Sequence, residues 1–122
     1  MGEIFARNEL IERVASARAA GLTVAFANGC FDLLHVGHTR YLEAAAAEGD
    51  RLIVAINDDK SVRRLKGRQG RPILASVDRA ELVAALRCVD YVVIFPESTV
   101  GPLLLEVKPD VHCKGTDYTF DT

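Results

Sequence analysis

Two histidines three positions apart, His35 and His38, are the residues in this sequence best suited to chemistry on a phosphate. They follow a short apolar run and precede a helical pattern, so they lie where a strand passes into the N-terminus of a helix. Free backbone N–H groups and the positive end of the helix dipole meet at such a point, and both favour an anion. Each imidazole can add a hydrogen bond to a phosphate oxygen as charge builds. The pair therefore predicts an anion site.

Two other interpretations of the histidines start from the same residues. For isolated histidines, the plainer one is that His38 caps the helix and His35 is a surface loop residue. The second is a metal site, because Cys30, His35 and His38 all carry ligand-capable atoms. No fourth ligand is near, and Cys30 stands in an apolar-flanked turn where it can act as a small buried hydrophobe. We therefore expect no metal ligands among the protein's own residues.

Two further residues of the same loop have expected roles. Gly37 lets a ligand approach the backbone closely, which a side chain would obstruct. Asp32 follows the turn, and we expect it to order the loop by accepting backbone N–H bonds rather than to act as a catalytic base.

The elements that position this loop alternate along the chain. A first helix is expected from about 8 to 20, with Asn8 as its N-cap and Gly21 just after its end. The other expected elements are strand 22–27, helix 38–48, strand 51–57, helix 76–87, strand 90–95, helix 98–108 capped by Ser98 or Thr99, and strand 110–114. This alternation predicts an α/β fold with a doubly wound, Rossmann-like parallel sheet. Its ligand crevice lies at the carboxyl ends of the strands, where the histidine loop stands.

Length and composition bound the class of protein. The chain has 122 residues, of which 49% are hydrophobic, so we expect a single domain over 1–122 with a core from about 22 to 119. No helix follows the last strand, so we expect the domain to be C-terminally incomplete, lacking a terminal strand and helix. Three cysteines without a C-x-x-C pair favour the reducing cytoplasm, and no apolar run is long enough to predict a membrane span.

Positive charge is concentrated in one segment. The net charge is −2, which does not favour a nucleic-acid partner. Five cations nevertheless fall close together, namely Arg63, Arg64, Lys66, Arg68 and Arg71. The glycines and proline of 67–72 predict a mobile loop there, so this segment favours a local anion site.

The stretch from Asn28 to His38 resembles the H-x-G-H signature of the cytidylyltransferase-like nucleotidylyltransferases. Further segments resemble, in the same order, the branch of that family that adenylylates D-glycero-β-D-manno-heptose 1-phosphate. They are 51–59, 61–67, 70–73, 78–95 and 114–119. The Arg- and Ser/Thr-rich segment with which family members usually close on the nucleotide has no match here.

The resemblance implies a reaction of ATP with the heptose 1-phosphate that gives ADP-heptose and pyrophosphate, a step toward the lipopolysaccharide core. It also implies Mg²⁺ bridging the phosphates. A sugar phosphate is largely dianionic at neutral pH, so it can attack without a protein base. Two alternatives stay open: a cytidylyltransferase for glycerol 3-phosphate or a related phosphate alcohol, and a nucleotide-binding module without catalysis. A homo-oligomer and a separate or fused sugar kinase are compatible with all of these.

The resemblance also assigns the site. Catalytic roles fall on His35, His38 and Lys66. Nucleotide binding is assigned to the remaining matched positions, which are Asn28, Gly29, Cys30, Phe31, Asp32, Gly37, Arg79, Arg87, Lys114, Gly115 and Asp117. Arg79 and Arg87 are eight positions apart, so within helix 76–87 they would share a face. The Lys114 segment would lie across the crevice from the histidines.

Overall fold

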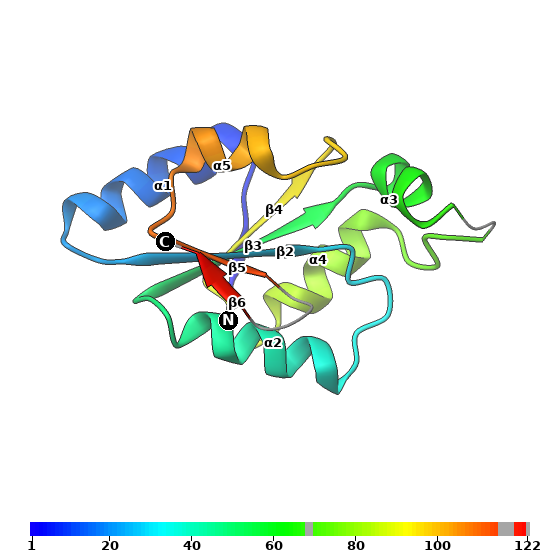
Figure 1. The fold of residues 1–122 in the computed structure, drawn as a ribbon, viewed down its shortest axis with the longest axis horizontal. Helices are drawn as coiled ribbons and strands as arrows, with labels where there is room; N and C mark the ends of the chain where they lie inside the picture. Colours follow the sequence, from blue (N-terminus) through cyan, green and yellow to red (C-terminus); the bar gives the residue numbers. More distant parts are fainter. Residues whose placement is uncertain (68–69, 115–118, 122) are drawn as a thin grey trace.

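The structure is a computed structural model that describes residues 1–67, 70–114 and the backbone of 119–121. It contains a single six-stranded sheet with helices on both faces (Figure 1). The strands are β1 (Glu3–Ile4), β2 (Val24–Gly29), β3 (Arg51–Asn57), β4 (Tyr91–Phe95), β5 (Val111–Lys114) and β6 (Thr119–Asp121). The helices are α1 (Arg7–Ala19), α2 (Val36–Ala46), α3 (Asp59–Lys66), α4 (Ser76–Ala84) and α5 (Gly101–Val107).

The sheet has the doubly wound order that the sequence predicts. Its strands lie in the order β1-β4-β3-β2-β5-β6. The first five are parallel, and β6 runs antiparallel to β5; the sequence pattern predicted neither β1 nor β6. The chain moves from β2 outward to β3 and β4, and then returns to place β5 on the other side of β2. The strand order therefore reverses between β2 and β5, directly beneath the histidine loop.

Two apolar layers cover the sheet. Figure 1 shows α2 and α4 on one face and α1 and α5 on the other. Along β2, Ala25 and Ala27 pack into the first layer and Val24 and Phe26 into the second, and all four are fully buried. Burial on both faces explains why this strand reads as a continuous apolar run.

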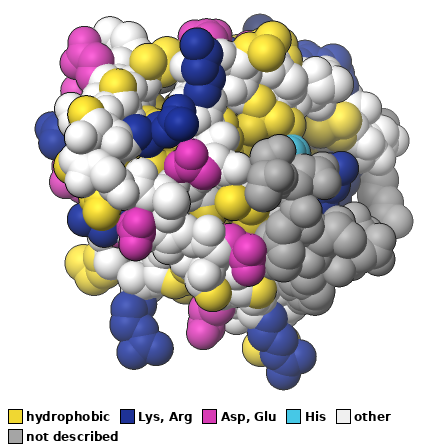
Figure 2. Space-filling view, turned by 60° about the vertical axis from the view of Figure 1, so that its left-hand side comes forward, with side chains coloured by type: hydrophobic (Ala, Val, Ile, Leu, Met, Phe, Trp, Pro, Cys, Tyr) yellow, Lys and Arg dark blue, Asp and Glu magenta, His cyan; other side chains and the backbone are white. Residues whose placement is uncertain are grey.

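On the surface, acidic and basic side chains are interspersed over the face seen in Figure 2. Among the described residues, no helix combines the length and the apolar character needed to cross a membrane.

The sequence predicted a capping side chain at the N-terminus of α1 and at that of α5, and the structure differs from both predictions. Helix α1 begins at Arg7, so the prediction of Asn8 as N-cap is wrong. Its N-terminus is closed by Glu9, whose Oε1 accepts the Ala6 N–H at 3.4 Å. Helix α5 begins at Gly101 without a side-chain cap, so the prediction of a cap from Ser98 or Thr99 is also wrong.

Helix α4 starts at Ser76 as predicted but ends at Ala84, before Arg87. A distant segment binds carbonyls here: Gly2 N–H donates to the oxygen of Ala84, the last residue of α4, at 2.7 Å, and the Met1 amino group donates to the oxygen of Arg87, beyond the helix, at 3.4 Å. Because these partners lie more than eighty positions away in sequence, a local pattern could not reveal them.

Helix α3 was not predicted, because the 59–66 segment lacks an apolar stripe and buries only Ser61 and Val62. Its signals are at its ends. The Asp58 carboxylate accepts the Ser61 N–H at 2.8 Å, and Gly67 closes the helix in the left-handed conformation, with φ of 62°. The basic segment is thus helical up to Lys66, just before the predicted mobile loop of 67–72, and residues 68–69 of that loop lie outside the described residues.

Candidate active site

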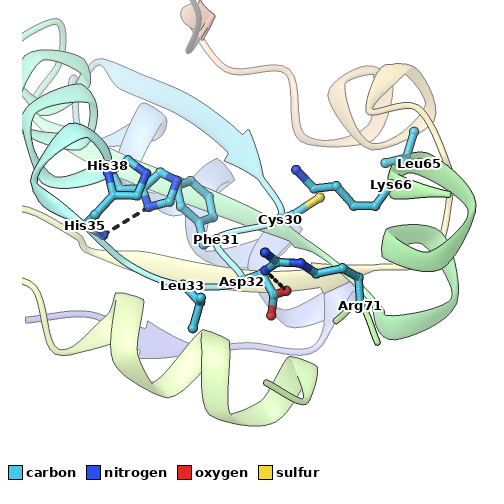
Figure 3. A pocket seen from close by; sticks show the side chains of 9 residues that line it. All are labelled: Cys30, Phe31, Asp32, Leu33, His35, His38, Leu65, Lys66 and Arg71. Carbon is cyan, nitrogen blue, oxygen red and sulfur yellow. Dashed lines mark hydrogen bonds and ion pairs between the residues drawn. The ribbon is translucent and has the colours of Figure 1, made fainter. Parts of the chain in front are cut away.

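A cavity of about 610 Å³ opens at the carboxyl end of the sheet, between the loop after β2 and the end of α3 (Figure 3). It is lined by Cys30, Phe31, Asp32, Leu33, His35, His38, Leu65, Lys66 and Arg71. An adjoining cavity of about 320 Å³ shares both histidines and adds Asn28, Gly29, Gly37 and Tyr41. The structure therefore brings the three predicted catalytic residues to one site.

His35 is itself the N-cap of α2. Its Nδ1 accepts the Gly37 N–H at 3.0 Å, and the Nδ1 of His38 lies 3.3 Å from the His35 backbone N–H that it accepts. A neutral imidazole that accepts at Nδ1 carries its proton on Nε2. Capping and anion binding are therefore compatible, because they use different ring nitrogens.

The two rings stack with their centroids 3.9 Å apart, and His38 also meets the edge of Phe31 at 5.2 Å. Burial, together with the nearby charges of His35 and Lys66, lowers the pKa of His38. This ring is consequently neutral near pH 7 and available as an N–H donor. Phe31 reaches it from a left-handed backbone, with φ of 50°, a conformation that costs free energy for a bulky residue.

The glycines of this loop serve the loop itself. A Cβ on Gly37 would lie 2.8 Å from the His35 Cε1 atom, and a Cβ on Gly29 would lie 3.0 Å from the Phe31 ring. A side chain at Gly37 would displace the capping imidazole. The structure thus shows that Gly37 makes room for the His35 ring. The close approach of a ligand to its backbone stays a prediction.

Asp32 fixes the segment that precedes α4. Its carboxylate is 6% exposed and accepts N–H bonds from Ile73 at 2.8 Å and Leu74 at 3.0 Å, and from Arg71 Nη1 at 2.8 Å. Burial alone would raise its pKa, but the bonds from Leu74, Arg71 and Ile73 outweigh burial and lower the pKa to about 2. These contacts are the loop-ordering contacts that we expected of this residue.

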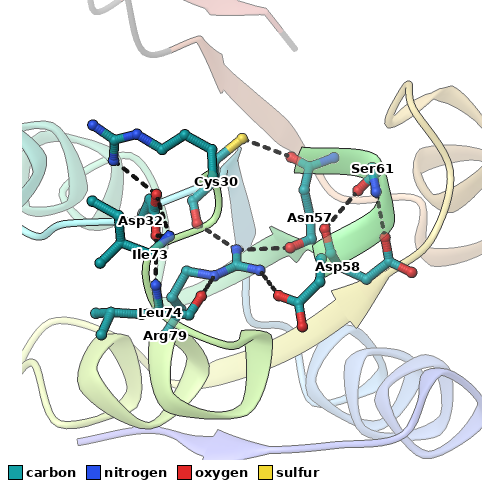
Figure 4. Close-up of polar contacts among 10 residues, drawn as sticks. Cys30, Asp32, Asn57, Asp58, Ser61, Ile73, Leu74 and Arg79 are labelled. Carbon is teal, nitrogen blue, oxygen red and sulfur yellow. Dashed lines mark hydrogen bonds and ion pairs between the residues drawn. The ribbon is translucent and has the colours of Figure 1, made fainter. Parts of the chain in front are cut away.

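Arg79 lies at the centre of the polar contacts in Figure 4 and is fully buried. Its Nε donates to the Leu74 oxygen at 2.9 Å, and its Nη1 donates to the oxygens of Cys30 at 2.7 Å and Asn57 at 2.8 Å. Nη2 pairs with Asp59 at 2.8 Å. The guanidinium is therefore occupied by protein acceptors, and the geometry gives it a positioning role instead of the predicted nucleotide contact.

Arg87 does not lie with Arg79 at this site. It lies beyond the end of α4 and lines a separate cavity with Thr39, Glu43, Leu86 and Cys88, so the predicted shared helix face is wrong.

The remaining predicted residues differ in position. Lys66 is exposed at the end of α3 and lines the larger cavity. Cys30 lies beside it, with its Sγ 3.8 Å from Asn57 Oδ1, and burial raises the pKa of this thiol.

Lys114 ends β5, the strand next to β2, as predicted, although neither cavity lining includes it. Gly115 and Asp117 lie outside the described residues.

Sequence reasoning missed two contacts of the site. His112 Nε2 lies 2.9 Å from Asn28 Oδ1, across the β2–β5 pair. Arg71 pairs with Asp32 across 39 positions. The pairing of β5 with β2 could have suggested the first contact, whereas no local signal indicates the second.

Comparison with known proteins shows the family of the chain. Residues 26–122 match the family described as cytidylyltransferase-like. The proteins named bifunctional protein HldE are 53% identical over 118 residues in Pseudomonas entomophila and 54% identical over 115 residues in Coxiella burnetii. These matches cover 97% and 94% of this chain, but the chain spans only about a quarter of each relative, 25% and 24%.

A solved structure has a similar fold. The lipopolysaccharide core biosynthesis protein from Thermoplasma volcanium superposes with a TM-score of 0.71 at 36% identity, over 83% of this chain and 80% of that one. The fold is thus that of a nucleotidyltransferase domain. The chain belongs to the cytidylyltransferase-like family, and its curated relatives carry the name HldE.

The buried Asp32 carboxylate should stabilise the fold in a pH-dependent way. Its pKa is about 2 in the folded protein and 3.8 ordinarily, so its contribution is complete above about pH 4 and is lost as pH falls through 2. Asp32→Asn should therefore lower the free energy of unfolding near pH 7 by about 2 kcal/mol, and by progressively less in acid. Urea unfolding across this pH range measures the difference. Asp78→Asn, an exposed position in α4, is the matched control, and equal losses in the two variants would contradict the assignment.

Replacing Arg79 should lower the stability of the fold more than replacing Asp32, because carbonyls from separate segments would lose their hydrogen-bond donor. We expect Arg79→Met to lower the free energy of unfolding by about 3 kcal/mol or more. Arg63→Met, at an exposed position of α3, should change it by less than about 0.5 kcal/mol. Chemical denaturation of both variants makes the comparison, and a loss below about 1 kcal/mol at Arg79 would mean that water replaces its contacts.

Proposed function

We propose that this domain transfers AMP from ATP to D-glycero-β-D-manno-heptose 1-phosphate, forming ADP-heptose and pyrophosphate. The observation that carries the proposal is the pair of imidazole Nε2 donors at the N-terminus of α2, facing the same cavity as Lys66. This arrangement concentrates positive potential and N–H donors where a triphosphate would lie.

The chemistry needs positioning more than proton transfer. An oxygen of the acceptor phosphate attacks the α-phosphorus of ATP, a new P–O bond forms, the α–β anhydride bond breaks, and pyrophosphate leaves with the electron pair. The histidines donate hydrogen bonds to the phosphate oxygens as charge develops, and the Lys66 ammonium offsets the charge of the two anions. Asp32 is held at a pKa of about 2 by its N–H donors and is not suited to act as a base.

The choice of ATP and the heptose 1-phosphate follows from the sequence resemblance, and the names of the relatives are consistent with it. The solved neighbour is titled a lipopolysaccharide core biosynthesis protein, and the curated relatives are called bifunctional. Because this chain spans about a quarter of those relatives, we propose that a second activity accompanies it. A sugar kinase fits that place, since it would supply the sugar phosphate that this site consumes. We assign both steps to the cytoplasm, where ATP is made.

We also propose that Mg²⁺ enters with the nucleotide. In the described part of the chain, no cluster of three or more His, Cys, Asp or Glu side chains could hold a metal ion, and the Asp32 carboxylate is already occupied by N–H donors. The triphosphate oxygens and water would therefore supply most of the ligands, which suits the preference of Mg²⁺ for oxygen and retained water. When bound, the ion would neutralise charge on the phosphates.

Pyrophosphate release tests the proposal directly. The chain is incubated with Mg²⁺ and either ATP or CTP, together with the heptose 1-phosphate or glycerol 3-phosphate. We expect release with ATP and the heptose 1-phosphate. Release with CTP and glycerol 3-phosphate alone would instead identify a cytidylyltransferase, and ATP binding without release in any mixture would identify a binding module without catalysis.

The catalytic residues can be tested on the same reaction. His35→Ala and His38→Ala should each reduce kcat by about two to three orders of magnitude, the scale for loss of one preorganised donor to a developing anion. Lys66→Ala should also reduce turnover, whereas Lys60→Ala, at an exposed position of the same helix, should not. Circular dichroism checks that the variants fold. Wild-type turnover in both histidine variants would refute their role.

A further inference from the structure

Arg71 enters the larger cavity on the side of Lys66, away from the stacked histidines (Figure 3). Its side chain is 29% exposed, and in the part of the chain that the structure describes its one ion pair is with Asp32, from Nη1 at 2.8 Å. A guanidinium carries five N–H donors in a planar fork. Most of the hydrogen-bonding capacity of Arg71 is therefore not used by that contact.

Asp32 does not depend on Arg71 for its own hydrogen bonds. The Ile73 N–H reaches both carboxylate oxygens, at 2.8 and 2.9 Å, and the Leu74 N–H adds a bond at 3.0 Å. If Arg71 turned away, the buried carboxylate would keep these backbone donors. The ion pair can consequently open without leaving a buried charge unpartnered, which is the usual cost of breaking such a pair.

The two cavities divide the space around the histidines. The smaller one reaches Asn28, Gly29 and Tyr41 on the β2 side, and the larger one reaches Lys66 and Arg71. The histidine pair lines both cavities. A nucleotide whose phosphates contact the histidines therefore has space for its nucleoside on the β2 side, and a second anion has space beside Arg71.

We propose that Arg71 is the binding residue for the phosphate monoester of the acceptor, and that it exchanges Asp32 for that phosphate when the acceptor enters. This inference rests on the proposed function and names which residue selects the acceptor. The planar fork suits two phosphate oxygens at once, and a phosphate dianion attracts it more strongly than a single carboxylate charge does. While Arg71 is paired, the Asp32 carboxylate offsets its positive charge. The site therefore favours acceptors that carry a phosphate able to hold Arg71.

Equilibrium binding tests this proposal without turnover. Inorganic phosphate is titrated calorimetrically into the protein saturated with α,β-methylene-ATP, and the nucleotide analogue is titrated alone in parallel. The proteins are the wild type, Arg71→Gln, Arg71→Lys and the control Arg40→Gln, which is an exposed position on α2. We expect Arg71→Gln to weaken phosphate binding about tenfold or more while changing analogue binding less than about twofold, as loss of a charged bidentate contact predicts.

The lysine variant separates binding from structure. Arg71→Lys keeps the charge and can still pair with Asp32, so a purely structural role would leave phosphate affinity at the wild-type value, whereas the proposal expects a clear loss. This comparison also decides the matter if Arg71→Gln does not fold. Unchanged phosphate affinity in the Arg71 variants, or no phosphate binding by the wild type, would overturn the proposal. An equal loss for the analogue would make Arg71 a nucleotide ligand instead.

Failure of the proposed function has a different signature. A wild-type chain that releases no pyrophosphate with any acceptor would refute the adenylyltransferase assignment, and phosphate affinity would still report on Arg71. In an active protein, Arg71→Gln should raise the KM for the sugar phosphate about tenfold or more with little change in the KM for ATP. A rise confined to the KM for ATP would contradict the proposal.

Discussion

The site depends on one buried positive charge. The Arg79 guanidinium binds acceptors from four separate segments: the loop after β2, the end of β3, the start of α3 and the segment before α4. Parallel strands end with their carbonyls facing the same edge of the sheet, and a fully buried cation among those carbonyls satisfies them while fixing their relative positions (Figure 4). The histidines follow one of these segments and Lys66 follows another. Their separation across the cavity is therefore set by a residue that does not line it.

A second contact of opposite sign joins two of the same segments. Arg79 extends from α4 to the loop after β2, whereas Asp32 extends from that loop to the backbone N–H groups before α4. Each charged side chain lies in one segment and forms hydrogen bonds with the backbone of the other. Because both groups are buried, the contacts are shielded from water and hold the loop without an apolar core of its own. This rigidity supports Phe31 in its left-handed conformation beneath His38.

The sequence predicted what local patterns control. Strand β3 was predicted with its observed bounds, and the α/β alternation led to the correct sheet and to the histidine loop at its switch point. The errors arose where distant residues decide the outcome. Helix α4 ends at Ala84, whose carbonyl accepts the distant Gly2 N–H, and Arg87 therefore lies outside the predicted helix face. Arg79 was recognised as important, but only the folded structure reveals that its partners are carbonyls of the protein.

The stacked imidazoles link the site to the acidity of the solution. The Nδ1 of His38 accepts an N–H bond that organises the start of α2, so a proton added at this Nδ1 breaks the bond and places a cation against the neighbouring ring at 3.9 Å. A polyanion beside the rings offsets that repulsion. Ligand occupancy and proton uptake are therefore thermodynamically coupled here, and the heat of nucleotide binding will depend on the ionisation enthalpy of the buffer.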